Sequence, residues 1–427
     1  MSALGIIFTE RTTQMFKIVY PICCGIDVHK TFVIACIAST NKAGITSYQS
    51  KRFSTFTKGL RELRQWLLSN SCVNVCMEST GKYFIPVYNI LEDGLKPIVA
   101  HPKYVKAIRG KKTDKRDARW IADLFKHDLV AASFIPPKNI RDLRDLMRYR
   151  FKLTNFGSSE KNRFQNCLTV SNIQLASVVT DTFGKSSMNI IEHILDNPLD
   201  RNIDIPSLIH GSLTKKLPEL ELAVDGVITQ TQAEKIKIIK QHYDSLDLCK
   251  FNLESVILSL SEPYRNEIEL LLSVPSVNNT FTAIGILSEI GADMSVFPSA
   301  KHLCSWAGLT PTNNESAGKK KSVRISRAGC YLKPLLVQCA TAVVKSEKHP
   351  EIRNRYLNLK KRRGHKKAII AICRMLLTAI YHILKKHEPY NPTLYKKVEL
   401  IPTSREITHE QALYIVQRQG YKVMAAT

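Results

Sequence analysis

The sequence lacks the segments and spacings that mark several common classes of protein. No uninterrupted apolar stretch reaches the ~20 residues that a membrane-spanning helix needs, and the nearest candidate, residues 368–384, contains Arg374 and His382. No secretory signal is evident, because Glu10 and Arg11 stand where an apolar segment would be needed. Repeats at solenoid periods and low-complexity segments are also missing. We therefore expect a cytoplasmic protein with no membrane partner.

Cysteine occurs 11 times but never as a C-x-x-C pair. The spacings do not fit a structural zinc site, which needs closely spaced pairs of ligands. Most of the cysteines lie in apolar runs. We interpret them as small core residues that are kept reduced in a cytosol.

Acidic residues are scarce beside basic ones, since 62 Lys and Arg against 37 Asp and Glu give a formal charge of +25. Such a surface can serve nucleic acid, an anionic membrane or solubility alone. With no spanning segment, a nucleic acid is the favoured partner. A chain of 427 residues also predicts two to three domains, at ~150 residues each.

The first third of the chain has the pattern of an α/β sheet. Apolar or alternating runs separated by helical segments predict a sheet of the ribonuclease H type, RuvC-like in its arrangement. A helix beginning at Thr57 as its cap separates the third strand from the fourth. The predicted strands are residues 22–27, 31–38, 46–53, 72–77 and 97–100.

Four acidic residues stand at the ends of these elements. Asp27 is the last residue of one predicted strand and Glu78 follows another, and Asp114 and Asp117 lie three apart at the start of a helix that Thr113 can cap. Each alone is more often a turn or cap residue, but the set predicts oxygen ligands for Mg²⁺ or Mn²⁺. Four basic residues crowd the two helical acids, as expected beside a phosphate path: Lys111, Lys112, Lys115 and Arg116.

The second half of the chain carries weaker signals. Residues 234–262 hold an apolar heptad that predicts a short coiled coil, either between two chains or packed on its own domain. A turn at 275–278 resembles a helix-hairpin-helix, although Ser276 and Asn278 stand where glycines are usual, so a plain helical hairpin remains open. A small-residue loop places Ser316 among cations, and composition alone favours a flexible polar loop there. These cations are Lys319, Lys320, Lys321 and Arg324.

Taken together, these residues resemble those of a known family. The segments CGIDVHKT, CMESTGKY, AHPKYVKAIRGKKTDKRDA and WAGLTPTNNESAGKKKSVRISRAGCYLKPLLVQCA resemble the insertion-sequence-110 family of DEDD transposases, from about Met15 to about Leu384. The resemblance implies a RuvC-like domain whose Mg²⁺-binding acids are the four named above. It also implies a C-terminal transposase domain whose nucleophilic serine is Ser316, forming a covalent phosphoserine link to DNA. Many family members read Ser-Gly-Gly where this chain has Ser316-Ala317-Gly318.

The same resemblance implies partners. Family members act as a tetramer of paired dimers joined by a helical coiled coil, and a non-coding bridge RNA pairs with donor and target double-stranded DNA. We therefore expect a homo-oligomer, and hypothesise a site shared between two protomers. The expected domains are an N-terminal extension, the RuvC-like domain, a helical linker with the coiled coil, the transposase domain and a basic helical region. Their expected bounds are residues 1–21, 22–180, 181–269, 270–350 and 351–427.

Three other functions compete with an RNA-guided recombinase. A RuvC-like junction-resolving nuclease would use metal-activated water and form no covalent intermediate. An actin-like ATPase or sugar kinase also begins with a strand ending in Gly-Ile-Asp, but it needs small residues next, where this chain has Val28, His29 and Lys30. A non-enzymatic DNA- or RNA-binding protein is the third.

Overall fold

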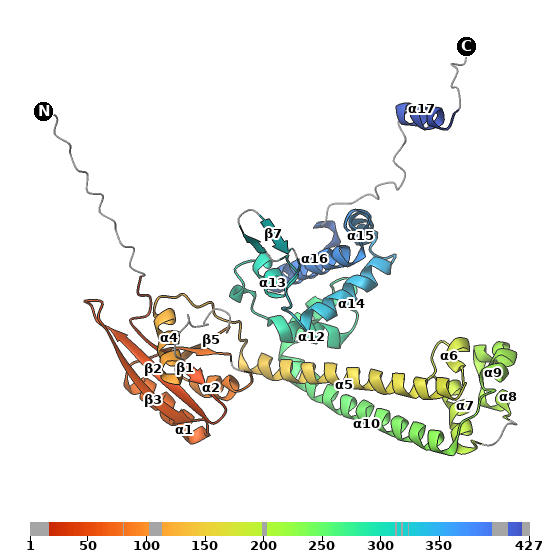
Figure 1. Ribbon diagram of the computed structural model, residues 1–427, viewed down its shortest axis with the longest axis horizontal. Helices are drawn as coiled ribbons and strands as arrows, with labels where there is room; N and C mark the ends of the chain where they lie inside the picture. Colours follow the sequence, from red (N-terminus) through yellow and green to blue (C-terminus); the bar gives the residue numbers. More distant parts are fainter. Residues whose placement is uncertain are drawn as a thin grey trace, which may run out of the picture. The chain divides into compact units, whose positions relative to one another are not determined.

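The computed structural model describes residues 17–79, 81–101, 113–198, 203–311, 314–316, 319–322, 324–394 and 409–420 (Figure 1). The chain divides into two compact units, residues 1–135 and 136–427. The first unit is an α/β domain and the second is mostly helical.

The first unit is built on a five-stranded mixed sheet with the order β3-β2-β1-β4-β5. The first three strands form an antiparallel meander, and β4 and β5 run parallel to β1. This confirms the expected α/β class, and the order is compatible with a ribonuclease H type of sheet. The strands are β1 (Ile22–Val28), β2 (Phe32–Thr40), β3 (Thr46–Ser54), β4 (Asn74–Glu78) and β5 (Lys96–Ala100).

Helices cover both faces of this sheet. On one face α1 (Thr57–Ser69) buries Leu60, Leu63 and Leu67 completely, and α2 (Phe84–Leu91) packs in the same apolar cluster. Leucines at these spacings share one side of a helix, as the sequence pattern predicts. The prediction that Thr57 caps α1 is wrong, because the N-cap is Phe56 and no side chain caps the helix.

The other face is covered by α4 (Asp114–Lys126), which approaches β1 very closely. A Cβ atom on Gly25 would lie 2.3 Å from the carbonyl oxygen of Ala118 and 2.4 Å from the backbone nitrogen of Ala122. The Cys23 thiol donates to the Ala122 carbonyl at 3.6 Å. Glycine in the strand and alanines on the helix therefore let the two backbones meet.

The second unit contains two long helices that pack side by side, α5 (Lys138–Val170) and α10 (Gln230–Ser261) (Figure 1). They run antiparallel, since Gln232 near the start of α10 donates to the Cys167 carbonyl near the end of α5. Farther along α10, Glu254 pairs with Arg150 at 2.6 Å. Much of the heptad stripe thus lies against α5 of the same chain.

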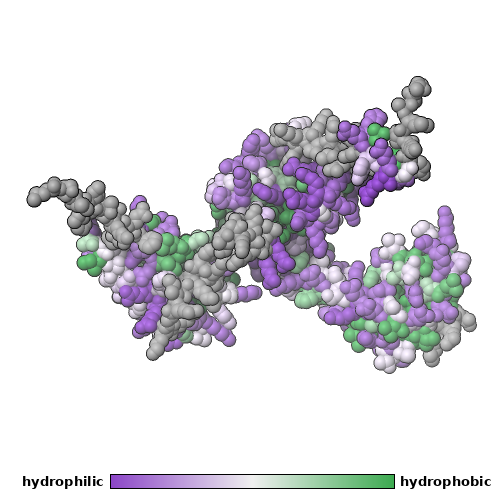
Figure 2. All heavy atoms as spheres, turned by 45° about the horizontal axis from the view of Figure 1, so that its top comes forward, coloured by the Kyte–Doolittle hydropathy of each residue, from purple (hydrophilic) through white to green (hydrophobic). Residues whose placement is uncertain are grey.

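A small helical lobe lies between α5 and α10 in the sequence. It has an apolar core of its own, to which the beginning of α10 contributes Ala233, Ile236 and Ile239. Figure 2 shows green apolar residues on the surface of this lobe amid purple polar ones, and Leu222 is 79% exposed there. The lobe consists of α6 (Leu175–Val178), α7 (Lys185–Asp196), α8 (Ile205–Leu208), the 3₁₀ helix η1 (Gly211–Lys216) and α9 (Leu217–Ala223).

A second helical body follows α10. Its central helix is α16 (His365–Lys386), which buries most of its apolar residues against α13 (Ala300–Trp306), α14 (Leu332–Lys345) and α15 (Pro350–Arg363). Among the described residues, α16 is the one helix long and apolar enough to cross a membrane, judged by length and composition only. The body consists of η2 (Glu262–Tyr264), α11 (Arg265–Leu272), α12 (Thr280–Ile290), η3 (Met294–Val296), α13 (Ala300–Trp306), β6 (Asn314–Ser316), β7 (Lys319–Ser322), α14 (Leu332–Lys345), α15 (Pro350–Arg363), α16 (His365–Lys386) and η4 (Pro392–Leu394), and α17 (His409–Arg418) comes last.

The turn between α11 and α12 has a left-handed residue at one of the two positions where hairpin glycines are usual, and the helix-hairpin-helix stays a prediction. Ser276 adopts a left-handed backbone with φ of 64°, a region that usually favours glycine. Asn279 caps α12 by accepting a hydrogen bond from the backbone nitrogen of Phe281 at 2.7 Å. A non-glycine residue therefore supplies the tight turn.

Arginines of α5 bind the pair of long helices, α5 and α10, to α12. Arg148 forms a bidentate pair with the buried Glu289 at 2.7 and 2.9 Å. Arg144 donates to the carbonyls of Ser288 and Glu289, which end α12, and burial lowers its pKa to about 10. Beside this joint lies a cavity of about 250 Å³ that Tyr331 also lines. The cavity is bordered by arginines already engaged in pairing.

A Gly25→Ala substitution tests the close packing of α4 on β1. The new methyl group meets backbone atoms that cannot turn aside, so we expect a loss of about 1–3 kcal/mol in the free energy of unfolding. Urea unfolding followed by tryptophan fluorescence measures it, since Trp66 and Trp120 lie in this unit. The control is Gly157→Ala within α5, where a Cβ would meet Tyr243 at an ordinary 3.6 Å. Equal stability of the two variants would contradict the packing argument.

Candidate metal centre

Two adjacent parallel strands place Asp27 and Glu78 at the same edge of the sheet. The register pairs Ile26 of β1 with Met77 of β4, so the two acids are the next residues on neighbouring strands. Ile26 and Met77 both belong to the apolar cluster on the α1 face. Side chains alternate along a strand, and Asp27 and Glu78 therefore both point to the face that α4 covers.

The first turn of α4 contributes the other two acids, Asp114 and Asp117. Thr113 caps the helix as the sequence predicts, accepting a hydrogen bond from the Arg116 backbone nitrogen at 3.4 Å. The helix runs antiparallel to β1, because Ala118 and Ala122 lie over Gly25 while the first turn lies toward Asp27. Three carboxylates thus approach one another from a strand and a helix.

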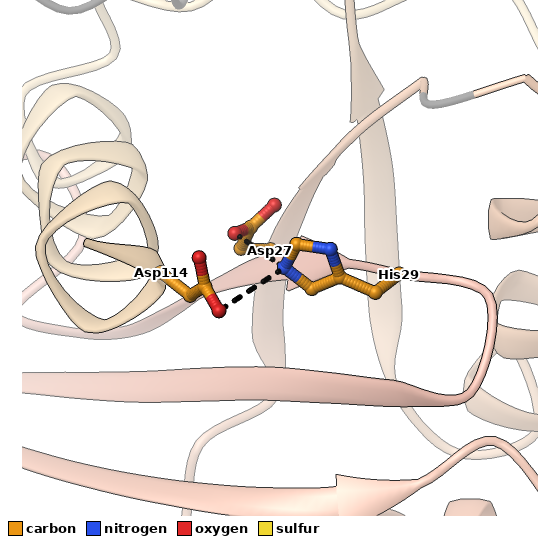
Figure 3. A group of neighbouring side chains, drawn as sticks. All are labelled: Asp27, His29 and Asp114. Carbon is orange, nitrogen blue, oxygen red and sulfur yellow. Dashed lines mark hydrogen bonds and ion pairs between the residues drawn. The ribbon is translucent and has the colours of Figure 1, made fainter. Parts of the chain in front are cut away.

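A histidine lies among these carboxylates (Figure 3). The Nε2 atom of His29 is 3.1 Å from Asp27 Oδ2 and 3.7 Å from Asp114 Oδ2. The ligand atoms of these three residues all lie within 4.8 Å of one another. Their side chains are 36%, 15% and 48% exposed for His29, Asp27 and Asp114, so the group is accessible from solvent.

The electrostatics of the group favour the binding of a cation. The pKa of the Asp27 carboxyl is raised above its ordinary value, chiefly because burial penalises the charged form. The negative charges of Asp117 and Asp114 raise it further, and His29 opposes the shift. A bound cation would relieve both the repulsion and the desolvation, which is how acidic metal sites are stabilised.

The oxygen and nitrogen donors of this group suit a divalent cation that is a hard or borderline Lewis acid. Asp27, Asp114 and His29 offer oxygen and nitrogen atoms at one point, and the charge of Asp117 acts on Asp27. Carboxylate oxygens suit Mg²⁺ and Mn²⁺. Among the described residues, no cysteine belongs to a group of three or more possible metal ligands, and nine of the cysteines are buried. Burial raises the pKa of Cys23 to about 12, so its thiol stays protonated.

His29 is not among the site residues predicted from the sequence. The available signal is its position two residues after Asp27, directly after the strand that carries this acid.

Only some of the residues predicted to contact nucleic acid lie in the part of the chain that the structure describes. Lys115 and Arg116 are exposed on the first turn of α4, and Arg324 is exposed after β7. Ser316 is the last residue of β6, where its backbone pairs with Lys319 of β7 in an antiparallel hairpin. Lys111, Lys112, Ala317, Gly318 and the side chains of Lys319, Lys320 and Lys321 lie outside the described part of the chain.

Comparisons with known proteins point to one family. A family described as "Transposase" matches residues 24–173, and one described as "Transposase IS116/IS110/IS902 family" matches residues 268–357. The first span contains the four acids, and the second contains Ser316.

Three curated relatives agree. The chain is 32% identical over 127 residues to an insertion element IS900 protein of Mycobacterium paratuberculosis, which is 29% of this chain and 31% of that protein. It is 27% identical over 145 residues to a pilin gene-inverting protein of Moraxella bovis, at 33% and 44%. It is 25% identical over 230 residues to an insertion element IS110 protein of Streptomyces coelicolor, at 53% and 50%. The chain thus spans about a third to a half of the length of these relatives.

Divalent cations should stabilise the first unit through the acidic group. With Mn²⁺ or Mg²⁺ at ~100 times its dissociation constant, we expect about 2.7 kcal/mol of added stability. Asp27→Asn should remove most of this gain because a partly buried ligand is lost. Thermal unfolding with and without the ion measures it. The control is Asp128→Asn, an exposed position with φ of 56° that asparagine tolerates. An undiminished gain in the Asp27 variant would contradict the assignment.

Proposed function

Because the chain belongs to the IS110 family of transposases, we propose that it is a DNA recombinase of an insertion sequence, cutting and rejoining DNA strands. The observation that carries this proposal is the convergence of Asp27, His29 and Asp114 at one edge of the sheet. The formal charge of +25 supplies the attraction to a polyanionic substrate.

The four acids would hold Mg²⁺, or Mn²⁺, in a RuvC-like domain. A bound divalent cation supplies charge neutralisation at phosphate oxygens during strand transfer. The chain's own contribution is to hold Asp27 and Glu78 on rigid strands and Asp114 and Asp117 on one helix turn. Rigid elements position such ligands more accurately than loops do.

Ser316 would act as the nucleophile. Its hydroxyl oxygen attacks a DNA phosphorus, a serine–phosphate ester forms, and the bond from phosphorus to the leaving sugar oxygen breaks. The serine gives up its proton, and the released sugar hydroxyl gains one. Rejoining reverses these steps with a hydroxyl from another strand, so the ester conserves the bond and no nucleotide is consumed.

Basic residues near both groups would hold the DNA backbone. Lys115 and Arg116 are exposed beside the acids, and Arg324 is exposed beside the Ser316 hairpin. We propose the same role for Lys111, Lys112, Lys319, Lys320 and Lys321. Phosphate contacts position a duplex without reading its sequence, which suits a protein whose donor and target sites are chosen by pairing with a bridge RNA.

We further propose a homo-oligomer of two to four chains, active in the cytoplasm at the nucleoid. Apolar residues remain exposed along α10 after it has packed on α5, among them Leu248 at 61%, Phe251 at 65% and Leu258 at 45% exposure, whose spacing of three and then seven residues places them on one side of the helix. Surface apolar residues in such a row favour a second helix as partner.

A junction-resolving nuclease is the second candidate. It needs the acids but not Ser316, because water would attack phosphorus directly. The acids and His29 alone provide a site that fits this chemistry, and the nuclease is therefore the alternative that the next measurement must separate.

Ser316→Ala should abolish strand cleavage and the covalent protein–DNA adduct together. A denaturing gel with labelled DNA detects the adduct, which the parent chain should form and the variant should lack. Asp27→Asn should also lose cleavage while DNA binding persists. The control is Ser322→Ala on the neighbouring strand β7, which should cut normally. Cleavage by Ser316→Ala at the parent rate would support the nuclease instead.

The mass of the purified chain tests the proposed partners. Light scattering with paired absorbance and refractive-index detection should give a protein mass of at least two chains. The same measurement should detect bound RNA, which ribonuclease removes. Phe251→Glu should reduce the protein mass because it places a charge in the apolar row. Asn252→Glu, at an exposed polar neighbour, is the matched control. A single chain free of RNA would contradict both proposals.

A further inference from the structure

One imidazole faces the carboxylates that are proposed to hold the cation. His29 Nε2 lies 3.1 Å from Asp27 Oδ2 and 3.7 Å from Asp114 Oδ2. The ring comes from the turn after β1, whereas the two acids come from β1 itself and from α4 (Figure 3). Three side chains from separate directions thus present one ligand atom each to a common volume.

The distances between the ligand atoms are compatible with a coordination shell. In an octahedral site with ligands about 2.1 Å from the ion, neighbouring ligand atoms are about 3 Å apart and opposite ones about 4.2 Å apart. The three ligand atoms lie within 4.8 Å of one another, with two separations of 3.1 and 3.7 Å. Movements of a few tenths of an ångström would let all three contact one ion.

The ring is held in this place before any ion binds. The backbone nitrogen of His29 donates to the Phe32 carbonyl at 3.0 Å and so closes the turn between β1 and β2. The imidazole also packs on the Phe32 ring, with centroids 4.5 Å apart and planes at 30°. A ligand fixed by its own backbone and by packing loses little entropy on binding.

We propose that His29 is a nitrogen ligand of the divalent cation and that it shifts the preference of the site from Mg²⁺ toward Mn²⁺. Imidazole nitrogen suits transition metals, and affinity for nitrogen-containing sites rises along the first-row series, whereas Mg²⁺ prefers oxygen ligands and keeps its waters. The inference rests on the proposed function, because it takes the acids to be the other ligands.

The competing role for His29 is to orient Asp27. In that role the protonated Nε2 atom donates a hydrogen bond to the Asp27 carboxylate, and no nitrogen contacts the ion. The two roles differ in one observable, the presence of nitrogen in the coordination shell.

Pulsed electron paramagnetic resonance of the full chain with one equivalent of Mn²⁺ detects that nitrogen. We expect a ¹⁴N coupling that becomes a ¹⁵N coupling when histidine is isotopically labelled. His29→Ala should bind Mn²⁺ without the coupling, and the ratio of Mg²⁺ to Mn²⁺ dissociation constants should fall about ten-fold. His210→Ala, an exposed residue of the second unit, should retain the parent signal. His29→Gln serves as a second variant should the alanine chain fail to fold.

The outcomes distinguish failure of the histidine ligand from failure of the carboxylate metal site. Bound Mn²⁺ with no histidine coupling, or a coupling that survives loss of His29, overturns the nitrogen ligand and leaves the carboxylate site intact. No Mn²⁺ bound by the parent chain, or equal binding by Asp27→Asn, overturns the metal site on which the proposed function depends.

Discussion

The close contact between α4 and β1 is the constraint on which the site depends. Gly25 lets the helix backbone lie against the strand, and a Cβ there would come within 2.4 Å of two backbone atoms of α4. This contact fixes the depth of the helix, and the antiparallel course of the helix sets which end lies near the carboxyl ends of the parallel strands. The first turn of α4 reaches Asp27 as a result. The acidic group is thus a consequence of how two elements pack.

The local charge at the candidate metal site is opposite in sign to the net charge of the chain. A strongly basic protein concentrates acids at one edge of a sheet, where burial and mutual repulsion raise the pKa of Asp27. Basic residues are exposed on the same helix turn as the acids. An arrangement of this kind attracts a cation and a phosphate backbone together, since each reduces the cost of holding the other.

The sequence predicted most of the first unit because its elements are regular. Apolar runs predict the strands, and acids at the ends of two of them make Asp27 and Glu78 candidate ligands. His29 was missed because a turn residue and a ligand have the same local sequence. The heptad of α10 did not reveal its partner, since a helix of the same chain and a second protomer accept the same apolar stripe. The role of Ser316 came from resemblance, because a short polar hairpin has no pattern that specifies chemistry.

The central claim is that carboxylates from β1, β4 and α4 share one divalent cation at the edge of the sheet. Anomalous diffraction from crystals grown with Mn²⁺ tests it most directly. We expect a peak within about 2.4 Å of carboxylate oxygens of Asp27, Glu78 and Asp114. A fully occupied Mn²⁺ elsewhere, with these carboxylates turned apart and none near the metal, would contradict it.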